Sequence, residues 1–321
     1  MGIGDSERDL MRRLTIVLAL VFAFTAAFSF LLRTYSQKFF DITGQARWIW
    51  AQARMSDAEP VAFFAARDFT LPENRIFTHL KVLGDPEYSV FVNGREIAGR
   101  TVDEESRALD LYDISGAVHT GRNRIVVAVR ASQGVGGLLA GIDIAPETAN
   151  FVVTDASWKI YRTWSPEILL RDPPNGKWQA PAVIGEPPVG RWNYLALEQR
   201  PLTSPPATAV QPHESFEQLA LLPVIRTVAG IAVATNARQR ATAFDFGFTK
   251  GRIRLTMQDA PFLSKAVNVR FANAREELAL VDWGMRRVVF APGEHVVTTP
   301  ESHDFRYVMV FGKGVTVEVV N

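Results

Sequence analysis

The sequence predicts an all-β protein in which two antiparallel β-sandwich domains follow one N-terminal transmembrane helix. Three observations predict this fold. One apolar run of bilayer length lies near the N-terminus. After it, short stretches rich in β-branched and aromatic residues recur between turn signals, and a proline-rich region separates them into two blocks. A chain of 321 residues has room for one membrane segment and two domains of ordinary size.

The apolar run begins at Leu14, ends at Leu32 and contains no charged residue. As a helix it would extend about 28 Å, which matches a bilayer core of about 30 Å. Arg13 and Arg33 flank the run rather than interrupt it. The alternative is a cleaved signal peptide, whose apolar region is usually about 7–15 residues long and ends in a small-residue cleavage pattern. Residues 29–40 lack that pattern, so we expect a transmembrane anchor that contacts the lipid bilayer.

The orientation of the anchor depends on weaker signals. Basic residues lie on both sides of the run: Arg8, Arg12 and Arg13 before it, Arg33 and Lys38 after it. A short tail, residues 1–13, and a large β-rich C-terminal part favour a cytoplasmic N-terminus. Arginine outnumbers lysine, which hints at a GC-rich bacterial genome. We therefore expect a single-pass protein of the bacterial inner membrane, with its C-terminal domains in the periplasm or outside the cell.

The first block, residues 33–199, is expected to form one β-sandwich. Residues 88–92 alternate in the manner of a strand, and Asn93-Gly94 then supplies the two positive-φ positions of a type I′ hairpin turn. Residues 124–129 are apolar on both faces near their middle, which predicts a central strand covered on both sides. The expected strands are residues 63–69, 76–83, 88–92, 124–131, 138–144 and 151–153.

Prolines concentrate in residues 171–215, and proline lacks a backbone donor, so we expect no central strand there. Residues 200–215 are expected to form an extended linker, and residues 216–321 a second β-sandwich. Residues 219–233 fit a short helix and a strand pair equally well. The expected strands of the second block are residues 241–246, 252–257, 266–271, 287–290, 305–311 and 315–320.

The composition excludes several classes of function. The chain has no cysteine, which excludes disulfides, thiolate catalysis, iron–sulfur clusters and cysteine-ligated zinc. The net charge is +1 and no basic face is evident, so we expect no nucleic-acid partner. We predict no metal site and no cofactor, because no two histidines have ligand spacing. The five are His79, His119, His213, His295 and His303.

Four motifs of the first block occur in an order that resembles galactose-binding-like jelly rolls. Such modules accompany bacterial α-L-rhamnosidases and β-galactosidases, and the resemblance covers roughly residues 45–195. The motifs are EYSVFVNG at residues 87–94, LYDI at 111–114, GRNRIVV at 121–127 and TDASWK at 154–159.

The second block resembles another accessory β-sandwich of the α-L-rhamnosidases. The similar pieces are residues 244–247 with Gly251, and residues 305–308 after Pro300. In those enzymes a large α-helical barrel follows and carries the catalytic carboxylates, whereas this sequence stops at Asn321. The resemblance therefore implies the fold of the accessory, non-catalytic domains and argues against hydrolase activity.

Glycosidase chemistry needs two carboxylates about 5–9.5 Å apart. Asp110 with Asp113, or Glu104 with Glu105, could supply such a pair. Acidic residues in a stretch such as LDLYDI more often cap turns. We therefore predict no catalytic residue.

Sugar binding uses an aromatic platform, and six tryptophans of the first block could provide one. Sandwich cores also contain tryptophan, and Trp48-Ile49-Trp50 is typical of a buried entering strand. Trp164 and Trp178 lie in the least regular region of the block. These two are the candidate sugar platform.

We expect a non-enzymatic, structural or accessory subunit of a larger inner-membrane complex, with membrane proteins as partners. A polysaccharide, a secretion, a respiratory and a photosynthetic complex all remain open. The alternative is a membrane-tethered carbohydrate-binding protein, with a glycan as its partner. A glycoside hydrolase is the third possibility.

Overall fold

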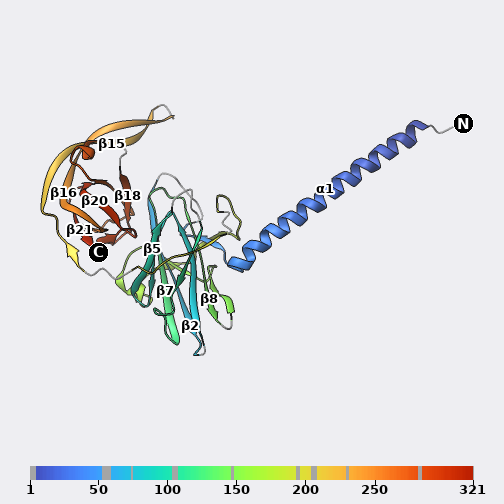
Figure 1. The fold of residues 1–321 in the computed structure, drawn as a ribbon, viewed down its shortest axis with the longest axis horizontal. Helices are drawn as coiled ribbons and strands as arrows, with labels where there is room; N and C mark the ends of the chain where they lie inside the picture. The colour runs from blue at the N-terminus through green and yellow to red at the C-terminus, as the bar shows by residue number, and fades with distance from the viewer. Residues whose placement is uncertain are drawn as a thin grey trace.

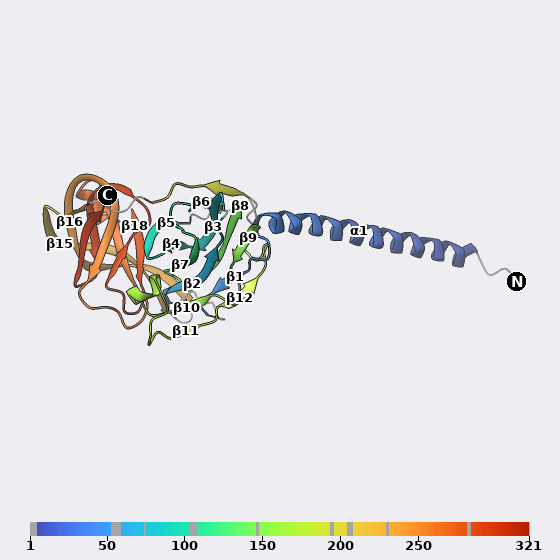
Figure 2. The same ribbon diagram turned by 90° about the horizontal axis from the view of Figure 1, so that it is seen from below.

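The computed structural model describes residues 5–52, 59–73, 75–102, 108–145, 148–192, 196–203, 208–228, 231–280 and 284–320. The described residues are mostly β-structure, with 54% of them in strands and 14% in helices. Three sheets make up a body from which one long helix projects (Figures 1 and 2).

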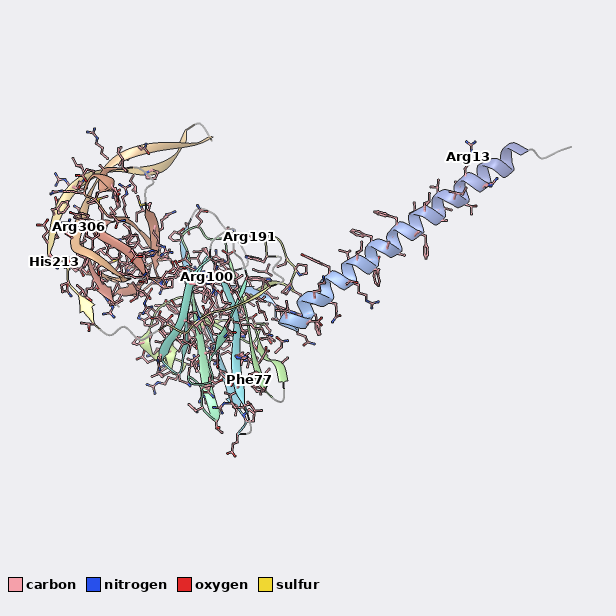
Figure 3. All side chains as sticks on the ribbon, viewed as in Figure 1. Arg13, Phe77, Arg100, Arg191, His213 and Arg306 are labelled. Carbon is pink, nitrogen blue, oxygen red and sulfur yellow. The ribbon has the colours of Figure 1, made fainter. Side chains whose placement is uncertain are left out.

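The helix α1 (Asp5–Thr43) is 39 residues long and extends well beyond the apolar run at both ends. Its part from Arg12 to Thr43 is long and apolar enough to cross a membrane, and no residue of its most apolar 18-residue stretch is buried. Figure 3 shows that the part of this helix around Arg13 has no other part of the chain beside it.

The C-terminal end of α1 is attached to the body. Gly44 adopts a left-handed φ of 58°, and its amide donates to the carbonyl of Phe40 at 2.7 Å, which ends the helix. The Nζ of Lys81 donates to the carbonyl of Ile42, and also to Oδ1 of Asn150 at 2.7 Å. The last turn is therefore held by the neighbouring sheet.

Two sheets enclose the first core. One has seven strands: β12 (Ala182–Gly185), β1 (Trp48–Trp50), β8 (Gly137–Ala145), β3 (Phe77–Asp85), β6 (Leu109–Asp113) and β13 (Leu197–Gln199) in that order, with β9 (Thr148–Val153) paired to β8. The other has six: β11 (Trp178–Gln179), β10 (Lys159–Tyr161), β2 (Val61–Leu71), β7 (Gly121–Ala131), β4 (Glu87–Val92) and β5 (Arg95–Thr101). Side chains of both sheets, such as Leu80 and Val127, form one buried cluster.

Most strand pairs of this part are antiparallel, as expected, but β13 pairs with β6 in parallel. The expected strands are all present. Asn93 and Gly94 have φ values of 50° and 87° between β4 and β5, which confirms the type I′ turn. Within the proline-rich region, β11, β12 and β13 all lie at sheet edges, as the missing backbone donors require.

The strand β7 confirms the prediction of a central, doubly covered strand. It lies between β2 and β4 in the six-stranded sheet. Ile125 and Val127 on one face belong to the first core, whereas Val126 and Ala128 on the other belong to a separate cluster. That cluster also contains Val289 of the third sheet, so the third sheet covers the outer face of β7.

The third sheet has eight strands and encloses its own core. Its path is β14 (Ala209–Val210), β21 (Val315–Val320), β16 (Ile231–Met257), β20 (His303–Phe311), β17 (Lys265–Ala272) and β18 (Met285–Phe290), and both β15 (Glu214–Val228) and β19 (Val296–Thr298) pair with β16. Residues 219–228 and 231–233 therefore pair as strands rather than form a helix. From the region 200–215, residues 209–210 form β14 and residues 214–215 begin β15.

A buried ion pair fastens the third sheet to the six-stranded sheet. Arg130 on β7 donates two hydrogen bonds of 2.7 Å to the carboxylate of Glu294, and a third of 2.8 Å to the carbonyl of Val289. The two charged side chains are 10% and 4% exposed. Because the pair crosses between the two cores, it couples them.

Candidate ligand-binding pocket

A cavity of about 590 Å³ opens where the chain leaves β10 and turns through the short helix η1 (Pro166–Leu169). Its wall combines an indole, hydroxyls, a carboxylate and an ammonium group, which is the mixture that binds a polar ligand with apolar faces. The residues that give it this character are Tyr161, Trp164, Ser165, Glu167, Asn175 and Lys177.

Trp164 has a fixed position in this cavity. Its ring lies 4.9 Å from that of Phe64, between centroids, and its backbone amide donates to the carbonyl of Pro292 at 2.8 Å. The side chain is half-buried and borders the cavity. Contact with both the six-stranded sheet and the third sheet therefore holds one aromatic surface at the cavity wall.

Trp178 lies outside the cavity wall, next in sequence to Lys177, which lines it. Its side chain is 52% exposed at the edge strand β11, and the ammonium group of Lys159 lies 5.2 Å from its ring centroid. The two candidate tryptophans are thus on neighbouring segments, but the structure places only Trp164 in the cavity wall.

A network of charged groups lies beside the cavity and centres on Asp172. Its carboxylate accepts hydrogen bonds from the hydroxyl of Tyr161 at 2.6 Å, from Arg124 at 2.9 Å and from Lys159. Burial favours a higher pKa for Asp172, but these hydrogen bonds outweigh it and lower the pKa to about 2. Burial and the hydrogen bond to Asp172 raise the pKa of Tyr161 to about 12. Both groups therefore keep one protonation state at neutral pH.

Asp110 has a different role from the turn cap predicted for it. It is fully buried on β6, where it accepts hydrogen bonds from Arg100 at 2.7 Å, Arg200 at 2.9 Å and the hydroxyl of Tyr88 (Arg100 is labelled in Figure 3). Burial raises the pKa of Tyr88 well above its usual range, so that hydroxyl stays protonated and continues to donate. The aspartate is an internal anchor, because two arginines from distant segments meet on it.

Asp113 confirms the turn-capping prediction. Its carboxylate accepts hydrogen bonds from the amide and the hydroxyl of Ser115, at 3.0 and 2.6 Å, and these lower its pKa. An odd spacing on one strand also directs Asp110 and Asp113 to opposite faces of the sheet. These two carboxylates therefore cannot face one glycosidic bond. The other candidate pair, Glu104 and Glu105, lies outside the described residues.

The histidines form no metal site in the described part of the chain, where no group of three or more potential ligands comes together. Nε2 of His303 lies 2.6 Å from the guanidinium of Arg286, and Nδ1 of His295 faces the carbonyl of Met257 at 3.3 Å.

Comparison with known proteins gives matches among solved structures only: no protein-family model and no curated protein matches this chain. The fold is similar to that of an α-L-rhamnosidase from Dictyoglumus thermophilum, with a TM-score of 0.50 and 15% identity, over 86% of this chain and 35% of that chain. An α-L-rhamnosidase from Aspergillus terreus gives a TM-score of 0.49 and 14% identity, over 86% and 36% of the two chains. A lectin from Pleurotus ostreatus, in complex with GalNAc, gives 0.39 and 15%, over 87% and 75%.

The chain therefore spans about a third of the length of the rhamnosidase that it matches first. At this identity the likeness concerns the fold alone. The matched part is β-structure, and the described residues include a single α-helix, α1, so the helical barrel of those enzymes is not within them. The resemblance that the sequence motifs predicted is confirmed: this chain has the fold of the accessory β-domains of the α-L-rhamnosidases.

Proposed function

We propose that the chain is a membrane-anchored, non-catalytic protein that serves as an accessory subunit of a bacterial inner-membrane assembly, with its β-sheet body outside the cytoplasm. We also propose that residues 33–199 and 216–321 are its two β-sandwich domains. The observation that carries the proposal is the apolar run of α1, whose most apolar 18-residue stretch has no residue buried by the body.

The exposed surface of α1 requires a cover other than water. Leu20 and Phe22 are 65% and 77% exposed, and their neighbours along the run are similar. Burying one such side chain contributes about 1.5–3 kcal/mol, so a rod with many of them partitions strongly into a bilayer. The helix also continues unbroken to Thr43 and is bonded to Lys81 of the body. This continuity favours a retained anchor over a signal peptide that is cut away.

A helical partner fits one face of the rod. Ala19, Ala23 and Ala27 recur at intervals of four residues and therefore lie on the same face. Small residues at this spacing allow two transmembrane helices to approach closely. The hydroxyl of Thr25 is already bonded to the carbonyl of Val21 at 2.8 Å, so it need not seek a partner.

The carboxylates support a non-catalytic role. Asp110 is occupied by two arginines and a tyrosine, and Asp113 caps a turn. Asp172 is held by three donors. Each of these groups therefore has a structural task that its ionised form performs.

Mild solubilisation of native membranes tests the proposal. We expect the full-length chain to migrate in a complex much larger than its own 35.7 kDa, with a constant set of membrane proteins after affinity isolation. Ala23→Leu should weaken that association by filling the small-residue face, whereas Val21→Leu, on the opposite face of the helix, should leave it intact. Migration of the wild-type chain on its own would refute the accessory role.

Carbohydrate binding is a second candidate, favoured by the indole of Trp164 at the wall of the 590 Å³ cavity. We propose Trp164 as the platform, with the exposed Trp178 as a neighbouring contact. Titration of the full-length protein in detergent with bacterial and plant glycans should show binding that Trp164→Ala and Trp178→Ala weaken. Phe248→Ala, which removes a more exposed aromatic side chain from the third sheet, is the control. Absence of binding at millimolar sugar would exclude this candidate.

A further inference from the structure

The β15–β16 hairpin extends far beyond the third sheet. Its two strands pair through fifteen residue pairs, from Glu214 opposite Asp245 to Val228 opposite Ile231. The next strand, β20, accompanies β16 only as far as Thr242. From there the hairpin is a two-stranded ribbon, and Figure 1 shows it leaving the body and pointing toward the side from which α1 projects.

The base of this ribbon is covered by the body. Ala220 and Leu222 are buried beside Leu278 of the short helix η2 (Glu276–Ala279), and Arg270 donates to the carbonyl of Leu221 at 3.0 Å. We call residues 224–235, which follow this base along the hairpin, the distal hairpin.

The sequence of the distal hairpin is VIRTVAGIAVAT, with Arg226 as its one charged residue. A strand pair that is exposed to water on both faces would carry polar side chains on both. Here the residues of both faces, which alternate along each strand, are largely apolar. A two-stranded hairpin is at best marginally stable in water. The distal hairpin therefore requires an apolar environment.

The charge of the surrounding segment indicates which environment this is. From Gln218 to Arg240 the sequence contains three arginines and no acidic residue. Arg238 and Arg240, near the base, are exposed to solvent, and Arg240 lies 3.9 Å from the carboxylate of Glu217, so Arg226 and Arg238 carry the unbalanced positive charge. An apolar tip with basic residues behind it is the arrangement that anionic lipid headgroups attract.

The dimensions also fit a bilayer. Residues 33–43 continue α1 above its apolar run and would raise the body about 16 Å over the hydrocarbon. The five pairs beyond Pro223 would extend roughly 17 Å at 3.3–3.4 Å per residue. The reach of the distal hairpin thus matches the gap that the helix creates.

We propose that the distal hairpin inserts through the headgroup region to the apolar boundary of the same membrane that α1 crosses, as a second contact of the chain with lipid. This inference rests on the proposed anchor. Two contacts, one through the helix and one through the hairpin, would fix the tilt of the body over the membrane.

The absence of cysteine allows a direct test with single labels. The full-length protein, reconstituted into phosphatidylcholine–phosphatidylglycerol vesicles, would carry an environment-sensitive fluorophore at Val228→Cys or Ala232→Cys. Ala26→Cys in the apolar run tests the anchor, and Thr316→Cys, on the exposed face of β21, is the control for water exposure. Quenching is measured with lipids that bear a nitroxide on the acyl chain.

We expect a blue-shifted emission and strong quenching at positions 228, 232 and 26, and neither at 316. Quenching at 26 with none at 228 and 232 would overturn the hairpin contact while leaving the anchor in place. Labels at 228 and 232 that are shielded from water in native membranes, but not in vesicles that contain only this protein and lipid, would also overturn it, in favour of a protein partner. Lack of quenching at position 26 would refute the anchor itself.

Discussion

The ion pair between Arg130 and Glu294 gives the sharpest prediction for stability. Glu294→Leu removes the two hydrogen bonds of 2.7 Å from Arg130 and one of 2.9 Å from the amide of Ala291, and leaves Arg130 in a site where its side chain is 10% exposed. Burial favours a lower pKa for Arg130, but carboxylates, with Glu294 the largest contributor, outweigh it and raise the pKa; without Glu294 only Glu87 and Glu96 oppose desolvation. Breaking a buried pair by removing one partner costs about 3–5 kcal/mol.

The loss should also uncouple the two cores. Six of the seven tryptophans lie in residues 48–192, so intrinsic fluorescence reports the first two sheets, whereas far-UV circular dichroism reports all three. In urea we expect coincident transitions for the wild-type protein and separate ones for Glu294→Leu. The free energy of unfolding should fall by about 3–5 kcal/mol for the third sheet.

The double variant Arg130→Met with Glu294→Leu provides the control. It leaves no unpaired charge, so its loss of stability should be much smaller than that of Glu294→Leu alone. A single variant that costs less than about 1 kcal/mol, the value of an exposed pair, would refute the reasoning. A double variant that costs the sum of the two single ones would refute it equally.

Three further predictions concern the first two sheets. Asp110→Ala should lower the free energy of unfolding by about 3–5 kcal/mol in a denaturation assay, because it removes the carboxylate that the buried Arg100 binds. Asp113→Ala removes only a turn cap, so in the same assay it should cost about 1 kcal/mol. Gly94→Ala should cost about 1–2 kcal/mol, since its φ is +87° and a Cβ would lie 2.7 Å from Leu170, and a melting temperature equal to that of the wild type would contradict this. The pKa of Asp172 is lowered from 3.8 to about 2, so its contribution to the free energy of unfolding is complete above about pH 4 and is lost as the pH falls toward 2. The effect should be small because the side chain is 39% exposed. Asp172→Asn should remove this contribution from the measured pH dependence of unfolding.

The strands can be predicted where the pattern of neighbouring residues is enough to define a strand or a turn. Alternation in residues 88–92, the Asn93-Gly94 turn and the doubly apolar residues 124–129 each act through the period of a strand or the φ of a turn, so no distant contact is needed to interpret them. The hairpin of residues 219–233 was undecided because its two faces are equally apolar, and only pairing with β16 defines it.

The candidate site was less accessible to sequence analysis, because its parts meet through the tertiary fold. Trp164 lies at the cavity wall because it packs on Phe64, which is far away in the sequence, and the residues next to Trp164 do not indicate that contact. Asp110 was misassigned for a similar reason: its partners Arg100 and Arg200 lie on segments that the motif around it does not include. Trp178, chosen with Trp164 for its irregular surroundings, instead lies on an edge strand.

The helix continues without a break from the apolar run to Gly44, so the apolar run and the body cannot rotate independently about the helix axis. Because Lys81 binds Ile42 at the end of this helix, the number of residues in the helix sets the direction in which the body faces around the helix axis. Adding or deleting one residue between positions 33 and 40 would turn the cavity and the hairpin by about 100° around that axis. A partner protein that binds one face of α1 would therefore also determine the direction in which the pocket opens.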